Sequence, residues 1–209
     1  MFVDREPRFY ATVTYSGAYW RGRQIDFRMG APDGRTGGPD YTTTGYLMRK
    51  FLDEDGVDIL RGVFVNKTWN YFRLGELYLN YAEALNEWKH GPTTEAYDAI
   101  NKVRRRGFGN PDDTSICDLP AGLDEAAFRE AVRKERAYEL AFEGHRRLDL
   151  VRWGIYYKTI QETSNKLSNW YSSANYVVAQ YTEEGKHELM PIPQREMDLC
   201  PQFKQNPKW

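Results

Sequence analysis

The stretch Asp124–Gly154, DEAAFREAVRKERAYELAFEGHRRLDLVRWG, decides the fold of this chain. It contains no proline, and its interior is rich in residues that favour helix. Asp124 is placed to cap a helix, and Glu125 stands in the first turn, where the helix dipole favours an anion. Gly144 interrupts the helical pattern, and a second apolar pattern follows it. The stretch therefore predicts two consecutive helices.

One face of the first helix mixes apolar side chains with carboxylates, which is unusual for a simple core stripe. Steps of three and four residues join Phe128, Ala131, Val132, Glu135, Tyr138, Glu139 and Phe142. Glu143 and Arg147 stand four residues apart, and Asp149 and Arg152 stand three apart, so each pair can interact along a helix. We interpret the charges as a structural ion network that ties the two helices together. Its members are Glu135, Arg136, Glu139, Glu143, Arg146, Arg147, Asp149 and Arg152.

A catalytic interpretation of Glu139 and Glu143 stays open beside the structural one. Side chains four residues apart on a helix lie roughly 5–6 Å apart at Cβ, which is near the carboxyl separation of a retaining glycosidase. Several arginines stand within reach of both residues. Such arginines normally neutralise carboxylates and do not leave them with a raised pKa, so the structural interpretation is favoured.

Composition excludes several classes of partner and cofactor. Lys and Arg number 29 and Asp and Glu number 30, so a net charge of -1 gives no support to nucleic acid or an anionic membrane surface as a partner. No apolar run is long enough to span a membrane, and the first residues do not begin a signal peptide. The three histidines are isolated in sequence and no nucleophile-base motif occurs, so we expect no metal, no cofactor and no catalytic site. Cys117 and Cys200 lack CxxC spacing, and we expect two free thiols, with one disulfide as the alternative.

Aromatic residues make up 15% of a chain whose mean hydropathy is only -0.75. Sugar-binding surfaces use such residues, because one face of a pyranose is apolar and packs on an aromatic ring. The loop Gly30–Asp40 and nearby segments supply both rings and polar groups. Our candidate ligand contacts are Tyr19, Trp20, Asp33, Arg35, Asp40, Trp69, Trp170 and Tyr171. Burial in the core is the alternative for Trp20, Trp69, Trp170 and Tyr171.

Helical periodicity extends well beyond the opening stretch. Residues 71–88 form the clearest amphipathic pattern, Thr93 or Thr94 can cap a second helix, and Gly107 ends it. Tyr71, Leu74, Gly75 and Tyr78 occupy the spacing of a tetratricopeptide repeat, with tyrosine in place of tryptophan. We predict a mainly α fold with tetratricopeptide-like helix pairs, long loops and a few short strands or hairpins.

The chain is expected to form a single domain with four segments. Residues 1–69 are rich in loop and strand, with a strand-like run over Phe9–Tyr15. Residues 70–107 and 123–162 are the two helix pairs. Residues 163–209 form a loop, a hairpin and a proline-rich tail, in which Tyr176–Tyr181 pairs with His187–Met190.

These motifs together resemble the SusD/RagB family. The resemblance is carried by Glu135-Arg136, Glu139–Arg146, Asp149-Leu150 and Arg152–Gly154, by Glu6–Phe9 near the start, and by Leu189–Pro193 near the end. The chain departs from the family pattern at Cys200-Pro201 and at its final Lys208-Trp209, which bears on local packing. The resemblance implies a non-enzymatic glycan-binding lipoprotein on the outer membrane of Bacteroidota, which delivers oligosaccharide to a SusC-like TonB-dependent transporter.

The same resemblance implies that the chain is an incomplete domain. Family members are usually much longer, and only one well-formed repeat is visible here, whereas a stable solenoid needs about three. We therefore expect a C-terminal portion, with the N-terminal part, the signal peptide and the lipid-anchor cysteine missing from this sequence. A tetratricopeptide-like scaffold that binds a protein or peptide, and a helical glycoside hydrolase, are the alternative functions. The sequence does not indicate which glycan is bound.

Overall fold

A computed structural model describes residues 2–28, 30–34, 42, 44–52, 54, 68–166 and 182–209. The chain divides into two compact units. The first comprises residues 1–25 and 47–146, and the second comprises residues 26–46 and 147–209. In the part of the chain so described, helices dominate and the strands form two small two-stranded sheets. No helix there is long and apolar enough to cross a membrane.

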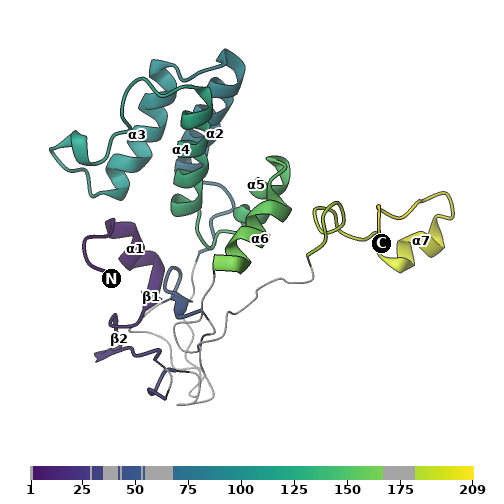
Figure 1. Cartoon of the computed structure of the whole chain (residues 1–209), viewed down its shortest axis with the longest axis horizontal. Coiled ribbons are helices and arrows are strands. Elements are labelled where there is room, and N and C mark those ends of the chain that lie inside the picture. Colours follow the sequence, from purple (N-terminus) through teal and green to yellow (C-terminus); the bar gives the residue numbers. More distant parts are fainter. Residues whose placement is uncertain are drawn as a thin grey trace. The chain divides into compact units, whose positions relative to one another are not determined.

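Three helices form the core of the first unit (Figure 1). They are α2 (Leu74–Lys89), α3 (Thr94–Gly107) and α4 (Glu125–Glu139). Small alanines at the contact positions allow the helices to approach closely, and larger side chains fill the space between them. The buried cluster consists of Leu79, Ala82, Ala96, Ala99, Ile100, Val103, Phe128 and Val132. Helices α2 and α3 lie within the segment 70–107 and pack against each other.

Capping side chains set the beginnings of two of these helices, as predicted. The Thr93 side chain accepts a hydrogen bond from Ala96 N at 3.3 Å, and Asp124 Oδ1 accepts one from Ala127 N at 2.7 Å. Each cap typically stabilises a helix by about 1 kcal/mol. The loop between α3 and α4 contains a 3₁₀ turn, η2 (Thr114–Ile116), and is fastened to α3 by side chains. Tyr97 Oη, for example, accepts from Leu123 N at 2.9 Å.

The N-terminal segment corrects one prediction, because residues 9–12 are helical rather than extended. Helix α1 (Pro7–Thr12) begins with Pro7, whose fixed φ suits the first helical turn and whose missing N–H costs nothing there. Only β1 (Val13–Tyr15) is a strand, and it pairs with β4 (Tyr46–Met48). A second small sheet joins β2 (Tyr19–Trp20) to β3 (Arg23–Gln24), antiparallel, with Tyr19 opposite Gln24.

The second unit contains most of α5 (His145–Arg152), α6 (Tyr156–Lys166) and α7 (Gln194–Leu199). The predicted strand His187–Met190 is wrong, because this segment forms successive turns. His187 N donates to Glu183 O at 3.3 Å, and Gly185 supplies a positive φ of 73° that suits a turn. The other predicted strand of this hairpin, Tyr176–Tyr181, lies outside the described residues.

The C-terminal tail is held by side-chain clamps on its own backbone. Gln205 binds both the N–H and the C=O of Ile192, at 2.8 and 2.9 Å. Trp209 Nε1 donates to Lys186 O at 3.1 Å, which closes the turn segment. These contacts satisfy backbone groups that no regular element satisfies. Both Cys117 and Cys200 are free thiols.

Candidate functional site

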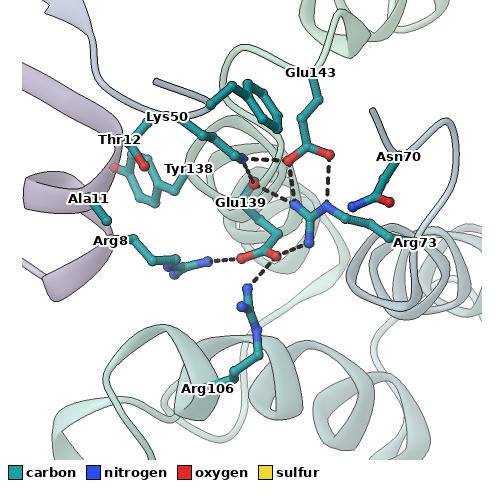
Figure 2. A pocket seen from close by; sticks show the side chains of 11 residues that line it. Arg8, Ala11, Thr12, Lys50, Asn70, Arg73, Arg106, Tyr138, Glu139 and Glu143 are labelled. Carbon is teal, nitrogen blue, oxygen red and sulfur yellow. Dashed lines mark hydrogen bonds and ion pairs between the residues drawn. The ribbon is translucent and has the colours of Figure 1, made fainter. Parts of the chain in front are cut away.

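The C-terminal end of α4 carries a buried group of charges, which we call the ion cluster. Glu135 and Glu139 stand one turn apart on α4, and Glu143 follows in the loop after it. The side chains of Glu135 and Glu139 are each only 1% exposed. Cations from other segments surround the three carboxylates, and Figure 2 shows Arg8, Lys50, Arg73 and Arg106 around Glu139 and Glu143. They are Arg8 on α1, Lys50 after β4, Arg73 before α2, and Arg104 and Arg106 on α3.

Each carboxylate of the ion cluster has at least two cationic partners. Glu139 binds Arg8 at 2.7 Å and also binds Arg73 and Arg106. Glu143 accepts two hydrogen bonds from Arg73, both 2.7 Å, and one from Lys50 Nζ at 2.5 Å. Glu135 binds Arg8 at 2.6 Å and Arg104 at 3.0 Å. The cluster thus joins α1, α3, α4 and the segments before α2 and after β4 through charge-assisted hydrogen bonds.

The cations decide the protonation state of the carboxylates. Burial by itself would raise the pKa of Glu139, but the hydrogen bond and charge of Arg73, together with Arg8 and Arg106, hold that pKa below its ordinary value. Burial likewise opposes ionisation of Glu143, and Arg73 and Lys50 outweigh it, so the pKa of Glu143 is also lowered. Both groups are therefore carboxylates at neutral pH.

Two glycines make room for the ion cluster. A Cβ at Gly107 would collide with the Arg8 guanidinium, and a Cβ at Gly75 would lie 2.8 Å from Glu139 Oε1. Gly75 is the second residue of α2, and Gly107 is the last residue of α3. The close approach of the arginines therefore accounts for glycine at both positions.

We expect the ion cluster to make stability depend on pH. Because the pKa values of Glu139 and Glu143 lie below the ordinary 4.5, their contribution is complete above about pH 4.5 and is lost as the pH falls through the lowered values. Urea unfolding of the wild type and of Glu143→Gln, from about pH 7 down to about pH 3, measures this. The stability difference between the two proteins should shrink on acidification. A difference that is the same at every pH would contradict the assignment.

Two hollows lie beside the ion cluster. The first, which we call the cluster hollow, has a volume of about 290 Å³, and Arg8, Lys50, Asn70, Arg73, Arg106 and Tyr138 contribute to its lining. In Figure 2, Thr12 and Tyr138 lie on one side of it and Asn70 and Arg73 on the other. The second, which we call the aromatic hollow, has a volume of about 430 Å³, and Arg5, Glu6, Phe9, Val13, Tyr138 and Phe142 contribute to its lining.

The residues interpreted as an ion network lie in several places. Glu135, Glu139 and Glu143 are in the ion cluster, and Arg136 is buried and donates to Asn80 Oδ1 at 2.5 Å. Within the second unit Asp149 pairs with Arg152 at 2.9 Å, and Arg147 donates to His187 O at 2.8 Å. Arg146 is exposed at the beginning of α5. The structure thus gives Glu143 the partners Lys50 and Arg73, which helix spacing does not reveal.

Four of the eight candidate ligand contacts lie within the residues that the structure describes. Tyr19 is 67% exposed on β2, and Trp69 is 47% exposed, with its ring 4.9 Å from that of Phe51. Trp20 is half-buried, with the Arg49 guanidinium 5.7 Å from its ring centre. In the second unit, Asp33 Oδ2 accepts from Asp26 N at 3.0 Å. The remaining four, Arg35, Asp40, Trp170 and Tyr171, lie outside the described residues.

In the described part of the chain, no three His, Cys, Asp or Glu side chains are grouped as metal ligands would be. The carboxylate oxygens of Glu139 and Glu143 in the ion cluster accept hydrogen bonds from arginines. What the ion cluster can do chemically is hold segments together and present positive charge. Sequence spacing did not predict that Arg8, Lys50, Arg73 and Arg106 bind these carboxylates, although Arg8 lies in the Glu6–Phe9 motif.

Comparison with known proteins relates the whole chain to one family. The SusD family model matches residues 1–209. SusD-like protein P25 of Formosa agariphila is 39% identical over 130 residues, which make up 62% of this chain and 22% of that protein. A SusD homologue from Bacteroides thetaiotaomicron, known from its crystal structure, is 49% identical with a TM-score of 0.78, over 98% of this chain and 41% of the homologue.

A third similar protein is named for what it binds. Surface glycan-binding protein A from Bacteroides uniformis is 25% identical, with a TM-score of 0.59, over 99% of this chain and 39% of that protein. The chain therefore spans less than half the length of each of these three proteins. The structural similarities confirm the predicted mainly helical fold.

Proposed function

This chain belongs to the SusD family, and we propose that it binds an oligosaccharide at the cell surface without cleaving it. The observation that carries the proposal is the family match over residues 1–209, combined with the similarity to a surface glycan-binding protein. We further propose that the full-length protein is an outer-membrane lipoprotein that passes its glycan to a SusC-like TonB-dependent transporter. Isolation of the full-length protein from outer membranes without any such transporter would contradict this last point.

Aromatic side chains available to solvent support sugar binding. Tyr19 and Trp69 expose about half or more of their surface in the first unit, and an exposed ring can pack against the apolar face of a pyranose. We propose that these two rings stack on the glycan. We keep the remaining polar and aromatic candidates in the proposed contact set, namely Trp20, Asp33, Arg35, Asp40, Trp170 and Tyr171.

The ion cluster supports binding without cleavage. A glycosidase needs one carboxyl group that keeps a proton near neutral pH, so that it can protonate the leaving group. Glu139 and Glu143 have lowered pKa values, and each binds at least two cations. Neither carboxylate therefore holds a proton near neutral pH, as a general acid must. We therefore assign the two carboxylates a structural role.

Single substitutions of the two exposed rings test where the glycan lies. We expect Trp69→Ala and Tyr19→Ala each to weaken glycan binding about tenfold, because the variant loses both the apolar area that the sugar buries on the ring and the stacking contact itself. Titration calorimetry against a glycan that binds the wild type measures the change. Trp88→Ala is the matched control, since Trp88 is 70% exposed on α2 and outside the proposed contact set. Wild-type affinity in both test variants would remove these rings from the site.

A further inference from the structure

We propose that the cluster hollow and the aromatic hollow together form a binding site for an acidic sugar, one that carries a carboxylate or a sulfate. This inference rests on the proposed function, because it names the class of glycan. The ring of the sugar would lie in the aromatic hollow, and its negative group would face the cations of the cluster hollow.

The two hollows are neighbours, because they share part of their lining. Arg8, Thr12 and Tyr138 line both of them. Their volumes, about 290 and 430 Å³, fall in the range of small-molecule sites when taken together. Both are formed within the first unit, by α1, the end of α4 and the loop after it, with Lys50, Arg73 and Arg106 on the cluster side. A ligand bound there would therefore contact residues from one compact part of the chain.

The aromatic hollow is lined by aromatic rings, and one of them stands at a strained position of the backbone. Tyr138 is 54% exposed and Phe142 is 47% exposed, and Phe9 also lines the hollow. Phe142 has a positive φ of 64°, which is a genuine outlier for a bulky residue. Such strain costs free energy and is found preferentially at ligand sites. Packing within the protein contributes little at Phe142, because about half of its surface is exposed. Stacking on a sugar would account for a strained, exposed ring at this position.

The lining of the two hollows carries an excess of positive charge. Five cations, Arg5, Arg8, Lys50, Arg73 and Arg106, face three carboxylates, Glu6, Glu139 and Glu143, so the excess is two charges. The carboxylates are held by Arg8, Arg73 and Lys50, which reduces their repulsion of an anion. Behind them, Arg104 and Glu135 balance each other.

Arg106 is the most exposed of the four cations that line the cluster hollow. Its side chain is 58% exposed, against 14% for Arg8 and 23% for Arg73 and Lys50. Among the described residues it donates one hydrogen bond, to Glu139, out of the five N–H donors of a guanidinium. The other donors can form the charge-assisted, bidentate pair that arginine makes with carboxylate or sulfate.

Pairs of glycans that differ only in charge test the proposal. Oligogalacturonate is compared with its methyl ester, and a sulfated galactan oligosaccharide with its desulfated form. We expect the charged member of at least one pair to bind about tenfold more tightly at low salt, with the preference shrinking as salt screens the attraction. Arg106→Gln should remove most of that preference, and Tyr138→Ala should weaken the binding of both members of the pair, because both stack on the same ring. Arg105→Gln should leave the preference unchanged, because Arg105 neighbours Arg106 but pairs with Asp118 and does not line either hollow.

The outcomes separate this site from the proposed function. Equal binding of the charged and neutral members of both pairs, or an unchanged preference in Arg106→Gln that is folded by circular dichroism, would overturn the acidic-sugar site. If neutral glycans still bind and Trp69→Ala or Tyr19→Ala weakens them, the proposed function stands while this site fails. Binding of no glycan at all would count against both.

Discussion

Replacing Glu139 with glutamine is expected to lower the free energy of unfolding by about 3–5 kcal/mol, the range for removing one partner of a buried ion pair. The Glu139 side chain is 1% exposed and binds Arg8, Arg73 and Arg106. A neutral amide of the same shape leaves the buried guanidinium groups of Arg8 and Arg73 short of negative charge. Arg106 contributes less to the loss, because it is 58% exposed and water replaces its partner.

Glu130→Gln on the same helix is the matched control for Glu139→Gln. Glu130 is 58% exposed and pairs with Arg133 three residues away, so its removal should change stability by no more than about 0.5 kcal/mol. Urea unfolding followed by circular dichroism compares the two variants at neutral pH. Similar small changes in both would mean that the ion cluster does not stabilise the first unit.

Phe128→Ala is expected to lower the free energy of unfolding by about 3–5 kcal/mol, as for other large-to-small changes in a packed core. Phe128 is fully buried between the three helices, and its ring packs edge-on against Tyr97 at 5.0 Å. Its removal takes away apolar burial and leaves a cavity between α2, α3 and α4. The same urea unfolding experiment measures the change.

Phe203→Ala controls for the loss of a phenylalanine at an exposed position. Phe203 is 45% exposed in the C-terminal tail, so we expect a change of no more than about 1 kcal/mol. Should Phe128→Ala be as mild as Phe203→Ala, the three-helix core would not be the main source of stability.

The helices could be predicted because their signals are local. Asp124 and Thr93 act as N-caps within one turn of their own backbone, and the apolar spacing of α2 and α3 is complete within each helix. The prediction that residues 9–12 are extended is wrong. Their aromatic and β-branched side chains favour a strand, but the helix that begins at Pro7 continues through them. The predicted strand His187–Met190 is wrong, because a hydrogen bond from Trp209 in the C-terminal tail holds this segment in turns. The local sequence pattern does not indicate this contact.

The ion cluster could be predicted only in part, because its two halves come from different segments. The carboxylates lie together on α4 and the loop after it, so helical spacing finds them. Arg8 is 131 residues from Glu139 in the sequence, and Arg73 is 66 residues from it. Only tertiary packing brings such residues together. The hollows, likewise, depend on where α1 packs against the end of α4.

A binding titration of a glycan panel, with analysis of every ligand for cleavage products, shows whether the protein binds a glycan without cleaving it. We expect at least one oligosaccharide to bind and to be recovered intact after prolonged incubation with the protein. Cleavage of a bound oligosaccharide that Glu143→Gln abolishes would establish a glycoside hydrolase and contradict the account. Failure of the folded protein to bind any glycan would contradict the binding function itself and favour the peptide-binding scaffold.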